Sequence, residues 1–225
     1  MSSMDDLVTE YVTKLAGHSA IIDKIIVQVL QTPTFRLLPL MLSLVWFWNE
    51  REKRPVIVNG LAAGFVTLFL TRFIQNIAPH RPRPLYSGNF DFAYPTALSA
   101  DWSSFPSDTA ALAFALAATV WIMSRKMGIL AMFWSTVVVS FPRLYTGAHY
   151  LSDIVGGAII GISCVIILSR WSYATAGIDD FFQKASSNHL RWFHVVLVSV
   201  AFEITTYFED IRKPAAEIFR AFGIK

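Results

Sequence analysis

Charge is scarce in this chain, and cysteine is almost absent. Charged residues make up 16% of the 225 positions, whereas an average soluble domain carries about 25%. Cys164 is the single cysteine, so no disulfide can form within the chain. The N-terminal residues MSSMDDLVTEYV lack both the basic region and the apolar stretch of a cleaved signal peptide. These absences argue against a disulfide-stabilised secreted domain and against an ordinary soluble protein.

Apolar residues, in contrast, are abundant and clustered. They make up 54% of the chain, and the mean hydropathy is +0.48. A helix needs about 20 residues to cross a hydrocarbon core of about 30 Å, and several apolar segments approach that length. We therefore expect an all-α fold, an integral membrane bundle of about six transmembrane helices. The segments are residues 33–48, 56–74, 107–123, 128–142, 154–169 and 193–208.

The first 32 residues differ from the rest in their pattern. Apolar side chains such as Leu7, Tyr11 and Leu15 recur at helical spacing, which predicts an amphipathic helical segment over residues 1–32. Such a segment either lies on the membrane surface or packs against the bundle. Residues 33–225 are expected to form the transmembrane domain.

Small and charged residues inside the apolar segments carry further information. Gly60 and Gly64, like Gly157 and Gly161, have the GxxxG spacing, which predicts close helix contacts inside the bundle or, secondarily, a dimer face. Glu203 lies in the last apolar segment and is either a functional carboxyl or a residue near the membrane interface.

The polar segments between the apolar ones alternate in character. Residues 49–55 and 124–127 are short and basic, whereas residues 75–106 and 143–153 are longer and rich in Pro, Arg, Ser, His and Asp. The positive-inside rule places the short basic segments in the cytoplasm and both longer segments outside. The net charge of +3 then reflects contact with anionic lipid headgroups rather than with nucleic acid.

Two polar clusters in the longer segments suit an anion. Residues 76–84 (NIAPHRPRP) place Arg81 and Arg83 in a stiff, proline-rich stretch, and guanidinium groups match phosphate oxygens, although headgroup anchoring is an alternative. In SSFPSDTAALAF, residues 103–114, Ser107 precedes an apolar helix. Its hydroxyl and the free N–H groups of that helix can hold phosphate oxygens, or Ser107 is an ordinary N-cap.

A third cluster, RLYTGAHYLSD at residues 143–153, adds a nucleophile. His149 and Asp153 are four residues apart, so on a helix they share one face. A carboxylate beside one imidazole nitrogen fixes the tautomer and leaves the other nitrogen free to act as a nucleophile or base. Arg143 precedes them across a Thr-Gly pair that allows a sharp reversal of the chain. The three clusters together predict a site for phosphoryl chemistry.

This combination resembles the type-2 phosphatidic acid phosphatase superfamily, which includes lipid phosphate phosphatases and undecaprenyl diphosphate phosphatases. The resemblance rests on Arg143-x5-His149-x3-Asp153, on the preceding Pro-Ser-Asp and on Arg-Pro-Arg-Pro at residues 81–84. It covers residues 76–153, about a third of the chain.

The resemblance implies a role for each matching residue. Arg83 and Arg143 would clamp the phosphoryl oxygens, and Ser107 with the amides near Asp108 would complete the cradle. His149 would attack phosphorus and form a phosphohistidine, with Asp153 orienting it. The resemblance also implies no metal and no other cofactor, so that arginines and helix amides neutralise the charge of the transition state.

Two positions depart from the family pattern. The lysine that usually begins the first motif is replaced by Asn76, and Arg72, one helical turn earlier, is placed to compensate. The histidine that protonates the leaving group is replaced by Thr109, which cannot serve as an acid near neutral pH. A lipid alcohol leaves as an alkoxide and needs that acid, whereas a diphosphate releases a phosphate monoester whose second pKa is about 6. The substitution therefore favours a diphosphate substrate.

The resulting functional hypothesis is a membrane-embedded lipid phosphatase that hydrolyses a polyprenyl (undecaprenyl-type) diphosphate during cell-envelope synthesis. The expected location is a bacterial inner membrane, with the site facing the periplasm or exterior. Two alternatives remain: a phosphoryl or glycosyl transferase that uses a polyprenyl-phosphate lipid, and a catalytically disabled lipid-phosphate binder. The expected partners are the lipid phosphate and the bilayer, not nucleic acid, and the sequence does not set the oligomeric state.

Overall fold

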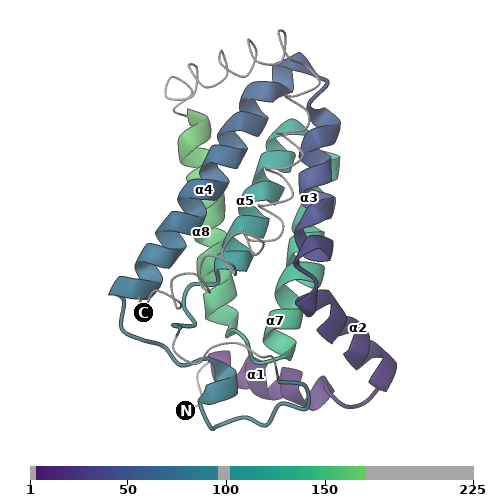
Figure 1. The fold of residues 1–225 in the computed structure, drawn as a ribbon, viewed down its shortest axis with the longest axis vertical. Coiled ribbons are helices and arrows are strands. Elements are labelled where there is room, and N and C mark those ends of the chain that lie inside the picture. Colours follow the sequence, from purple (N-terminus) through teal and green to yellow (C-terminus); the bar gives the residue numbers. More distant parts are fainter. Residues whose placement is uncertain (1–3, 96–101, 171–225) are drawn as a thin grey trace, which may run out of the picture.

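The computed structural model of the chain describes residues 4–95 and 102–170, and this part is helical without strands. Figure 1 shows the long helices running side by side, with short helices across one end. The helices are α1 (Met4–Leu15), α2 (Ala20–Gln31), α3 (Pro33–Phe47), η1 (Arg51–Lys53), α4 (Arg54–Ile77), η2 (Pro84–Tyr86), α5 (Asp108–Met123), α6 (Arg125–Trp134), the π-helical η3 (Ser135–Ser140), α7 (Phe141–Tyr145) and α8 (Leu151–Arg170). The expected all-α fold is confirmed.

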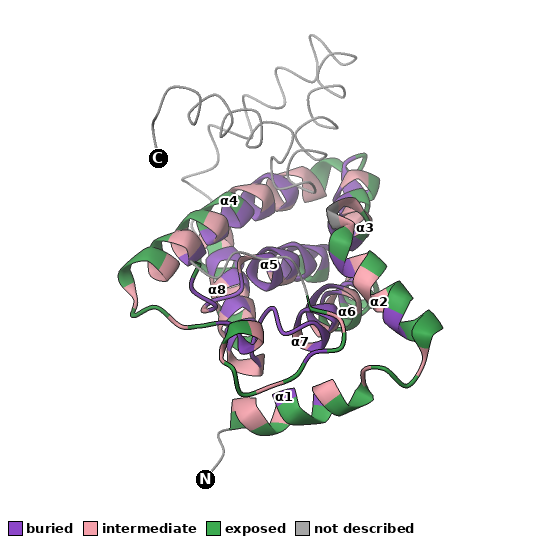
Figure 2. Cartoon of the chain, turned by 60° about the horizontal axis from the view of Figure 1, so that its bottom comes forward, coloured by how far each residue is buried: buried purple, intermediate pink, exposed green. Residues whose placement is uncertain are grey.

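Helix α5 lies at the centre of the bundle, surrounded by the other long helices (Figure 2). It is apolar around its whole circumference and rich in alanine, which is the pattern of a helix that is buried on all sides. Its side chains pack with Leu37, Leu40 and Leu44 of α3 in the main hydrophobic core. This position gives the N-terminus of α5 a fixed place at one end of the bundle.

Glycines allow two helices to approach α5 closely. A Cβ atom at Gly161 would lie 2.1 Å from the carbonyl oxygen of Ala111, and one at Gly157 would lie 2.5 Å from that of Ser107. A Cβ atom at Gly60 of α4 would lie 2.2 Å from a side-chain carbon of Thr119. Both GxxxG spacings therefore mark close contacts inside the bundle, as the sequence predicts.

A break in the regular α-helix joins α6 to α7. Pro142 lacks a backbone N–H and cannot bond to the carbonyl four residues earlier. The chain adopts a π-helical turn just before it, in which the N–H of Phe141 donates to the carbonyl of Thr136. Residues Arg125–Tyr145 still form one apolar stretch long enough to span a membrane.

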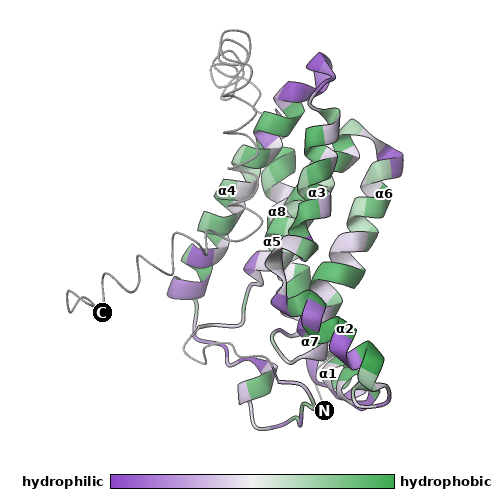
Figure 3. Ribbon diagram, turned by 45° about the vertical axis from the view of Figure 1, so that its right-hand side comes forward, coloured by the Kyte–Doolittle hydropathy of each residue, from purple (hydrophilic) through white to green (hydrophobic). Residues whose placement is uncertain are grey.

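Within the described residues, three helical stretches are long and apolar enough to cross a membrane, or up to four if the pair α2 and α3, bent by 61°, is one span. Helix α5 is apolar but has only 16 residues. Figure 3 shows hydrophobic residues along the middle of these helices and hydrophilic ones gathered at their ends. Five of the expected segments correspond to α3, α4, α5, α6–α7 and α8. Residues 193–208, with Glu203, lie outside the described residues.

The described parts of the two longer polar segments lie at the same end of the bundle. The C-terminus of α4, the N-termini of α5 and α8 and the C-terminus of α7 all meet there (Figure 1). Helices α1 and α2 lie at this end too, and the hydroxyl of Tyr145 donates to the buried carboxylate of Asp23 in α2. The N-terminal helices thus pack against the bundle beside the polar segments.

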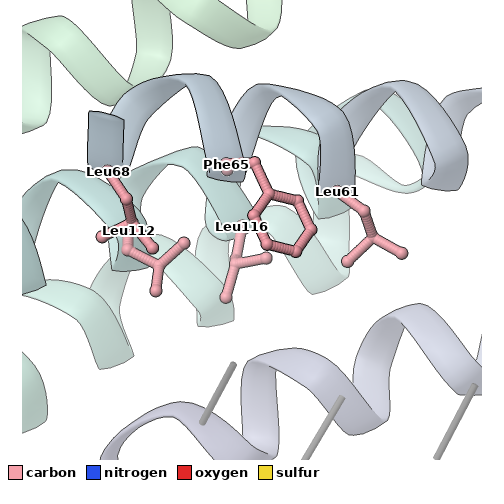
Figure 4. Close-up of a pocket in the computed structure, with 6 residues that line it drawn as sticks. Leu61, Phe65, Leu68, Leu112 and Leu116 are labelled. Carbon is pink, nitrogen blue, oxygen red and sulfur yellow. The ribbon is translucent and has the colours of Figure 1, made fainter. Parts of the chain in front are cut away.

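A small apolar crevice between α4 and α5 has no part in the polar site. Figure 4 shows Leu61, Phe65 and Leu68 facing Leu112 and Leu116 across it. Its volume is about 10 Å³, at the lower limit for a single water molecule. It is a gap in helix packing rather than a ligand site.

Candidate active site

His149 lies in the short connection between α7 and α8 and is only 2% exposed. The N–H groups of Ala148 and His149 both donate to the carbonyl of Arg143, at 2.9 and 3.2 Å, which closes the turn. Gly147 has φ +70°, a conformation that side chains with a Cβ rarely adopt. A Cβ atom there would also lie 2.7 Å from the ring of Phe92. The turn therefore needs glycine in order to bring His149 into the bundle.

The imidazole of His149 is held by a backbone carbonyl as well as by a carboxylate. Nδ1 lies 2.9 Å from the carbonyl oxygen of Ser104 and 3.7 Å from Oδ2 of Asp153. A carbonyl oxygen only accepts hydrogen bonds, so Nδ1 carries the proton in the neutral ring. Nε2 then keeps its lone pair, which is the form that a nucleophile or base requires.

Asp153 is completely buried at the start of α8. Its Oδ2 accepts hydrogen bonds from the hydroxyl of Ser104 and, at 2.8 Å, from the backbone N–H of Tyr150. Its Oδ1 accepts from Nη1 of Arg81 at 2.6 Å. A buried carboxylate with this many donors is stabilised in its ionised form and has a fixed orientation.

Two buried guanidinium groups flank His149. Nη1 of Arg83 donates to the carbonyl of Ala148 at 2.8 Å and lies 3.4 Å from Nε2 of His149. Nη2 of Arg143 donates to the hydroxyl of Thr109. Arg83 and Arg143 are 6% and 7% exposed, and the Nε atom of each has no hydrogen-bond partner among the described residues. Buried, unsatisfied donors are costly, and an oxyanion would satisfy them.

The N-terminus of α5 forms the opposite wall of the site. Ser107 is the N-cap, and its side-chain oxygen accepts from the N–H of Ala110 at 3.4 Å. Its own N–H donates to the carbonyl of Asp153 at 3.0 Å, which joins α5 to α8. The carboxylate of Asp108 accepts from the N–H of Thr109 at 2.7 Å, so an anionic group already lies at this helix end, as the helix dipole favours.

The end of α4 approaches the same wall. Nη2 of Arg72 lies 3.3 Å from Oδ2 of Asp108, and Gln75 donates to the carbonyl of Pro106 at 2.8 Å. Asn76 is exposed and lines, with Arg72, His80 and other residues, a groove of about 530 Å³. Arg72 therefore reaches the N-terminus of α5, whereas Asn76 lies on the exposed wall of this groove.

Arg81 differs from the other arginines of the site. Its guanidinium donates to Asp153 and, at 2.7 Å, to Asp5 of α1. It also lies over the ring of Tyr150, at 4.3 Å from the centroid. The structure thus places Arg81 on carboxylates behind the site, while Arg83 and Arg143 flank His149.

The surroundings of His149 disfavour its protonated form. Burial lowers the pKa of His149 below its ordinary value; Asp153 opposes this effect, and the positive charges of Arg143 and Arg83 add to it. Burial also lowers the pKa of Arg83, although a guanidinium stays charged at neutral pH. The site therefore holds a neutral imidazole between two cations, an arrangement suited to attack on an anionic phosphoryl group.

The structure brings together residues that the sequence singles out and residues that it does not. Seven of the predicted site residues lie around one buried centre: His149, Asp153, Arg83, Arg143, Ser107, Asp108 and Thr109. Ser104, Gln75 and Asp5 also take part. The sequence pattern assigns them no role, although Ser104 lies in the quoted stretch of residues 103–114. Only their long-range contacts reveal them, because each bonds to a residue at least 31 positions away.

Comparisons with known proteins point to one family. Undecaprenyl-diphosphatase BcrC of Bacillus subtilis (strain 168) is 26% identical over 164 residues, which are 70% of this chain and 79% of that protein. YbjG of Escherichia coli (strain K12), which carries undecaprenyl-diphosphatase as a provisional name, is 29% identical over 137 residues, 59% of this chain and 66% of that protein. The crystal structure of Aquifex aeolicus LpxE shares the fold, with a TM-score of 0.53 and 22% identity over 75% of this chain and 96% of that one. Residues 54–176 match the PAP2 superfamily, and with more than half of its length inside this match the chain belongs to the PAP2 superfamily.

Proposed function

We propose that the protein is a membrane-embedded phosphatase that hydrolyses a polyprenyl diphosphate, of the undecaprenyl type, through a phosphohistidine intermediate. One observation carries the proposal: Nε2 of the buried His149 lies beside Arg83, and both Arg83 and Arg143 have an Nε donor without a partner among the described residues. Two cations and a free imidazole nitrogen at one buried point are the elements of phosphoryl transfer to histidine. The names of BcrC and YbjG support the choice of lipid.

In the proposed first step, Nε2 of His149 attacks the terminal phosphorus of the diphosphate. An N–P bond forms, the bond from that phosphorus to the bridging oxygen breaks, and the polyprenyl monophosphate leaves with the electron pair. Arg83, Arg143 and the N-terminus of α5 stabilise the charge that builds up on the phosphoryl oxygens. In the second step water attacks the phosphohistidine and the N–P bond breaks. Inorganic phosphate leaves, the electron pair of that bond returns to Nε2, and a proton from the water passes to solvent.

The chemistry of the leaving group accounts for Thr109 in this scheme. A phosphate monoester has a second pKa of about 6, so it leaves at neutral pH without a proton from the enzyme. The hydroxyl of Thr109, bonded to Arg143, helps to place that guanidinium, and no general acid is required. A lipid monophosphate would release an alkoxide and is expected to be a poor substrate.

The residues at the edge of the site take supporting roles in the proposal. Arg72, through its ion pair with Asp108, supplies the positive charge that the lysine of the family pattern would give at Asn76. The groove beside Arg72 accommodates the rest of the diphosphate headgroup. Arg81 holds Asp153 rather than the phosphate. The mechanism needs no metal, and the site faces the outer side of the membrane.

A panel of phosphate-release assays in the presence of EDTA tests the proposal. Purified protein is given undecaprenyl diphosphate, undecaprenyl monophosphate and phosphatidic acid, with the variant His149→Ala as the blank. We expect release of inorganic phosphate from the diphosphate, trapping of a phosphorylated His149 in the wild type and neither in the variant. Turnover without free phosphate would instead indicate a transferase. Binding of the diphosphate with neither turnover nor adduct would indicate a disabled binder and refute the proposal.

A further inference from the structure

Helix α1 is fastened to the active-site end of the bundle through one carboxylate. Asp5, in its first turn, accepts hydrogen bonds from the N–H of Ser152 at 2.9 Å, from the hydroxyl of Ser152 at 2.6 Å and from Nη2 of Arg81 at 2.7 Å. Thr9 and Val12 lie buried on α1. Figure 1 shows α1 lying across this end of the bundle, below α7 and α8. The N-terminal helix therefore contacts the first turn of α8, directly after the connection that carries His149.

Arg81 links this carboxylate to the catalytic pair. Its Nη2 donates to Asp5, while its Nη1 donates to Oδ1 of Asp153 at 2.6 Å and to Ser152 at 2.7 Å. Charge-assisted bonds of this length are among the strong ones in proteins. Asp5 and Asp153 thus hold one guanidinium between them, and its orientation depends on both.

The backbone of Arg81 gives a second connection to His149. The carbonyl of Arg81 accepts from the N–H of Ser104 at 2.9 Å. The carbonyl of Ser104 in turn receives Nδ1 of His149, and its hydroxyl donates to Asp153. Ser104 and Asp153, the two residues whose oxygens face Nδ1 of the imidazole, are therefore both hydrogen-bonded to Arg81, Ser104 through its backbone N–H and Asp153 through its carboxylate.

Asp5 remains ionised when its contacts are made. Partial burial by itself would raise the pKa of Asp5, but the hydrogen bonds from Ser152 and Arg81 outweigh this effect and lower the pKa. A carboxylate with a lowered pKa stays charged throughout the neutral range. The charge that Asp5 contributes to its contact with Arg81 is therefore present at neutral pH.

We propose that Asp5 is a positioning residue: by fixing Arg81, it holds Asp153 and Ser104 against His149, so that the N-terminal helix is a functional part of the active site. The proposal rests on the phosphatase function proposed above. Asp5 acts through Arg81 and has no contact with the phosphate clamp formed by Arg83 and Arg143. Its loss is therefore expected to slow the chemical step and to leave substrate binding intact.

The variant Asp5→Asn tests this role in the full-length protein. An asparagine keeps the size of the side chain but presents an N–H2 group to donors of Ser152 or Arg81. Partners that orient metal-binding side chains are typically worth about 10- to 100-fold in affinity or activity. By analogy we expect kcat to fall about tenfold or more. KM should stay within about twofold, because the residues that bind the substrate phosphate are unchanged. Asp5→Glu, which retains the charge, should restore most of the lost kcat.

Glu10→Gln is the matched control, because Glu10 is on the same helix and pairs only with the exposed Lys14 among the ion pairs of the described residues. It removes the same charge without touching Arg81 and should leave kcat unchanged. If Asp5→Asn does not fold, as judged by thermal unfolding, Ser152→Ala removes one donor to the same carboxylate and should lower kcat by a smaller factor. Equal kcat values for Asp5→Asn and Glu10→Gln, or no recovery with Asp5→Glu, would overturn the proposal.

A spectroscopic readout separates this proposal from the proposed function. The ring ¹⁵N resonances of His149 are assigned among the five histidines with the variant His149→Ala. Asp5→Asn should shift these resonances, and Glu10→Gln should not. If the wild type turns over no substrate but Asp5→Asn still shifts these resonances, the phosphatase function is refuted and the positioning role is retained. Unchanged resonances would refute the positioning role whatever the activity.

Discussion

Replacing Thr109 with histidine gives the most direct test of the leaving-group argument. Thr109 is buried, and its hydroxyl accepts from Nη2 of Arg143, so the side chain at this position lies one hydrogen bond from the proposed phosphate clamp. An imidazole introduced there is placed to protonate the leaving oxygen. We expect Thr109→His to raise the rate with a lipid monophosphate far more than the rate with a diphosphate.

The size of the effect follows from two contributions. General acid catalysis is typically worth about 10²- to 10⁴-fold, about 3 to 5 kcal/mol of barrier at 1.36 kcal/mol per tenfold, and an alkoxide leaving group gains all of it. A phosphate monoester, with a second pKa of about 6, gains little. The substitution also removes the hydrogen bond from Arg143, but this loss affects both substrates equally and cancels in their ratio. The ratio of the monophosphate rate to the diphosphate rate should rise by at least about tenfold.

The assay measures release of inorganic phosphate from phosphatidic acid and from undecaprenyl diphosphate under identical detergent conditions. Thr109→Asn is the matched control, because an amide can still accept a hydrogen bond from Arg143 but cannot act as an acid. Thermal unfolding of both variants checks that the larger side chains fit at the start of α5. An unchanged ratio in Thr109→His, or the same change of ratio in Thr109→Asn, would refute the reasoning.

Two further expectations follow from the pH behaviour of His149 and from the packing of α8. Burial and the nearby arginines lower the pKa of His149, and only the neutral ring is a nucleophile, so the acidic limb of the kcat/KM profile should lie below pH 6.5; a limb above that value would contradict the environment described for the ring. Gly161→Ala would push a Cβ atom to 2.1 Å from the carbonyl oxygen of Ala111, and such overpacking costs about 1–3 kcal/mol. Its thermal midpoint in detergent should fall clearly, whereas Val155→Ala, at an exposed position of the same helix, should change it little.

Most of the fold could be predicted from the order of apolar and small residues along the sequence. Apolar segments long enough to span a bilayer must become helices, because only internal hydrogen bonds can satisfy the backbone there. For this reason five of the six expected segments correspond to observed helices. The GxxxG spacings point correctly to close packing, since only glycine allows the backbone of Ala111 to approach α8 as it does.

The sequence also singles out the residues that we propose to react, for a similar reason. Arg143, His149 and Asp153 lie within eleven consecutive positions, so their relation depends on local geometry: one turn at Gly147 and the first turn of α8. Arg83 and Ser107 carry residue types whose chemistry suits phosphate. What is local in the chain, or chemically specific in a side chain, could be inferred without coordinates.

What only the tertiary structure decided is which partner each polar group receives. Arg81 and Arg83 are nearly adjacent and chemically identical, yet one faces Asp153 and Asp5 while the other lies beside His149. Ser104 supplies the carbonyl for His149, and Asp5 reaches Arg81 across 76 positions. These contacts depend on how α1, α5 and α8 meet at one end of the bundle. They are fixed by the packing of helices that are far apart in the sequence, and no short-range pattern of residues predicts that packing.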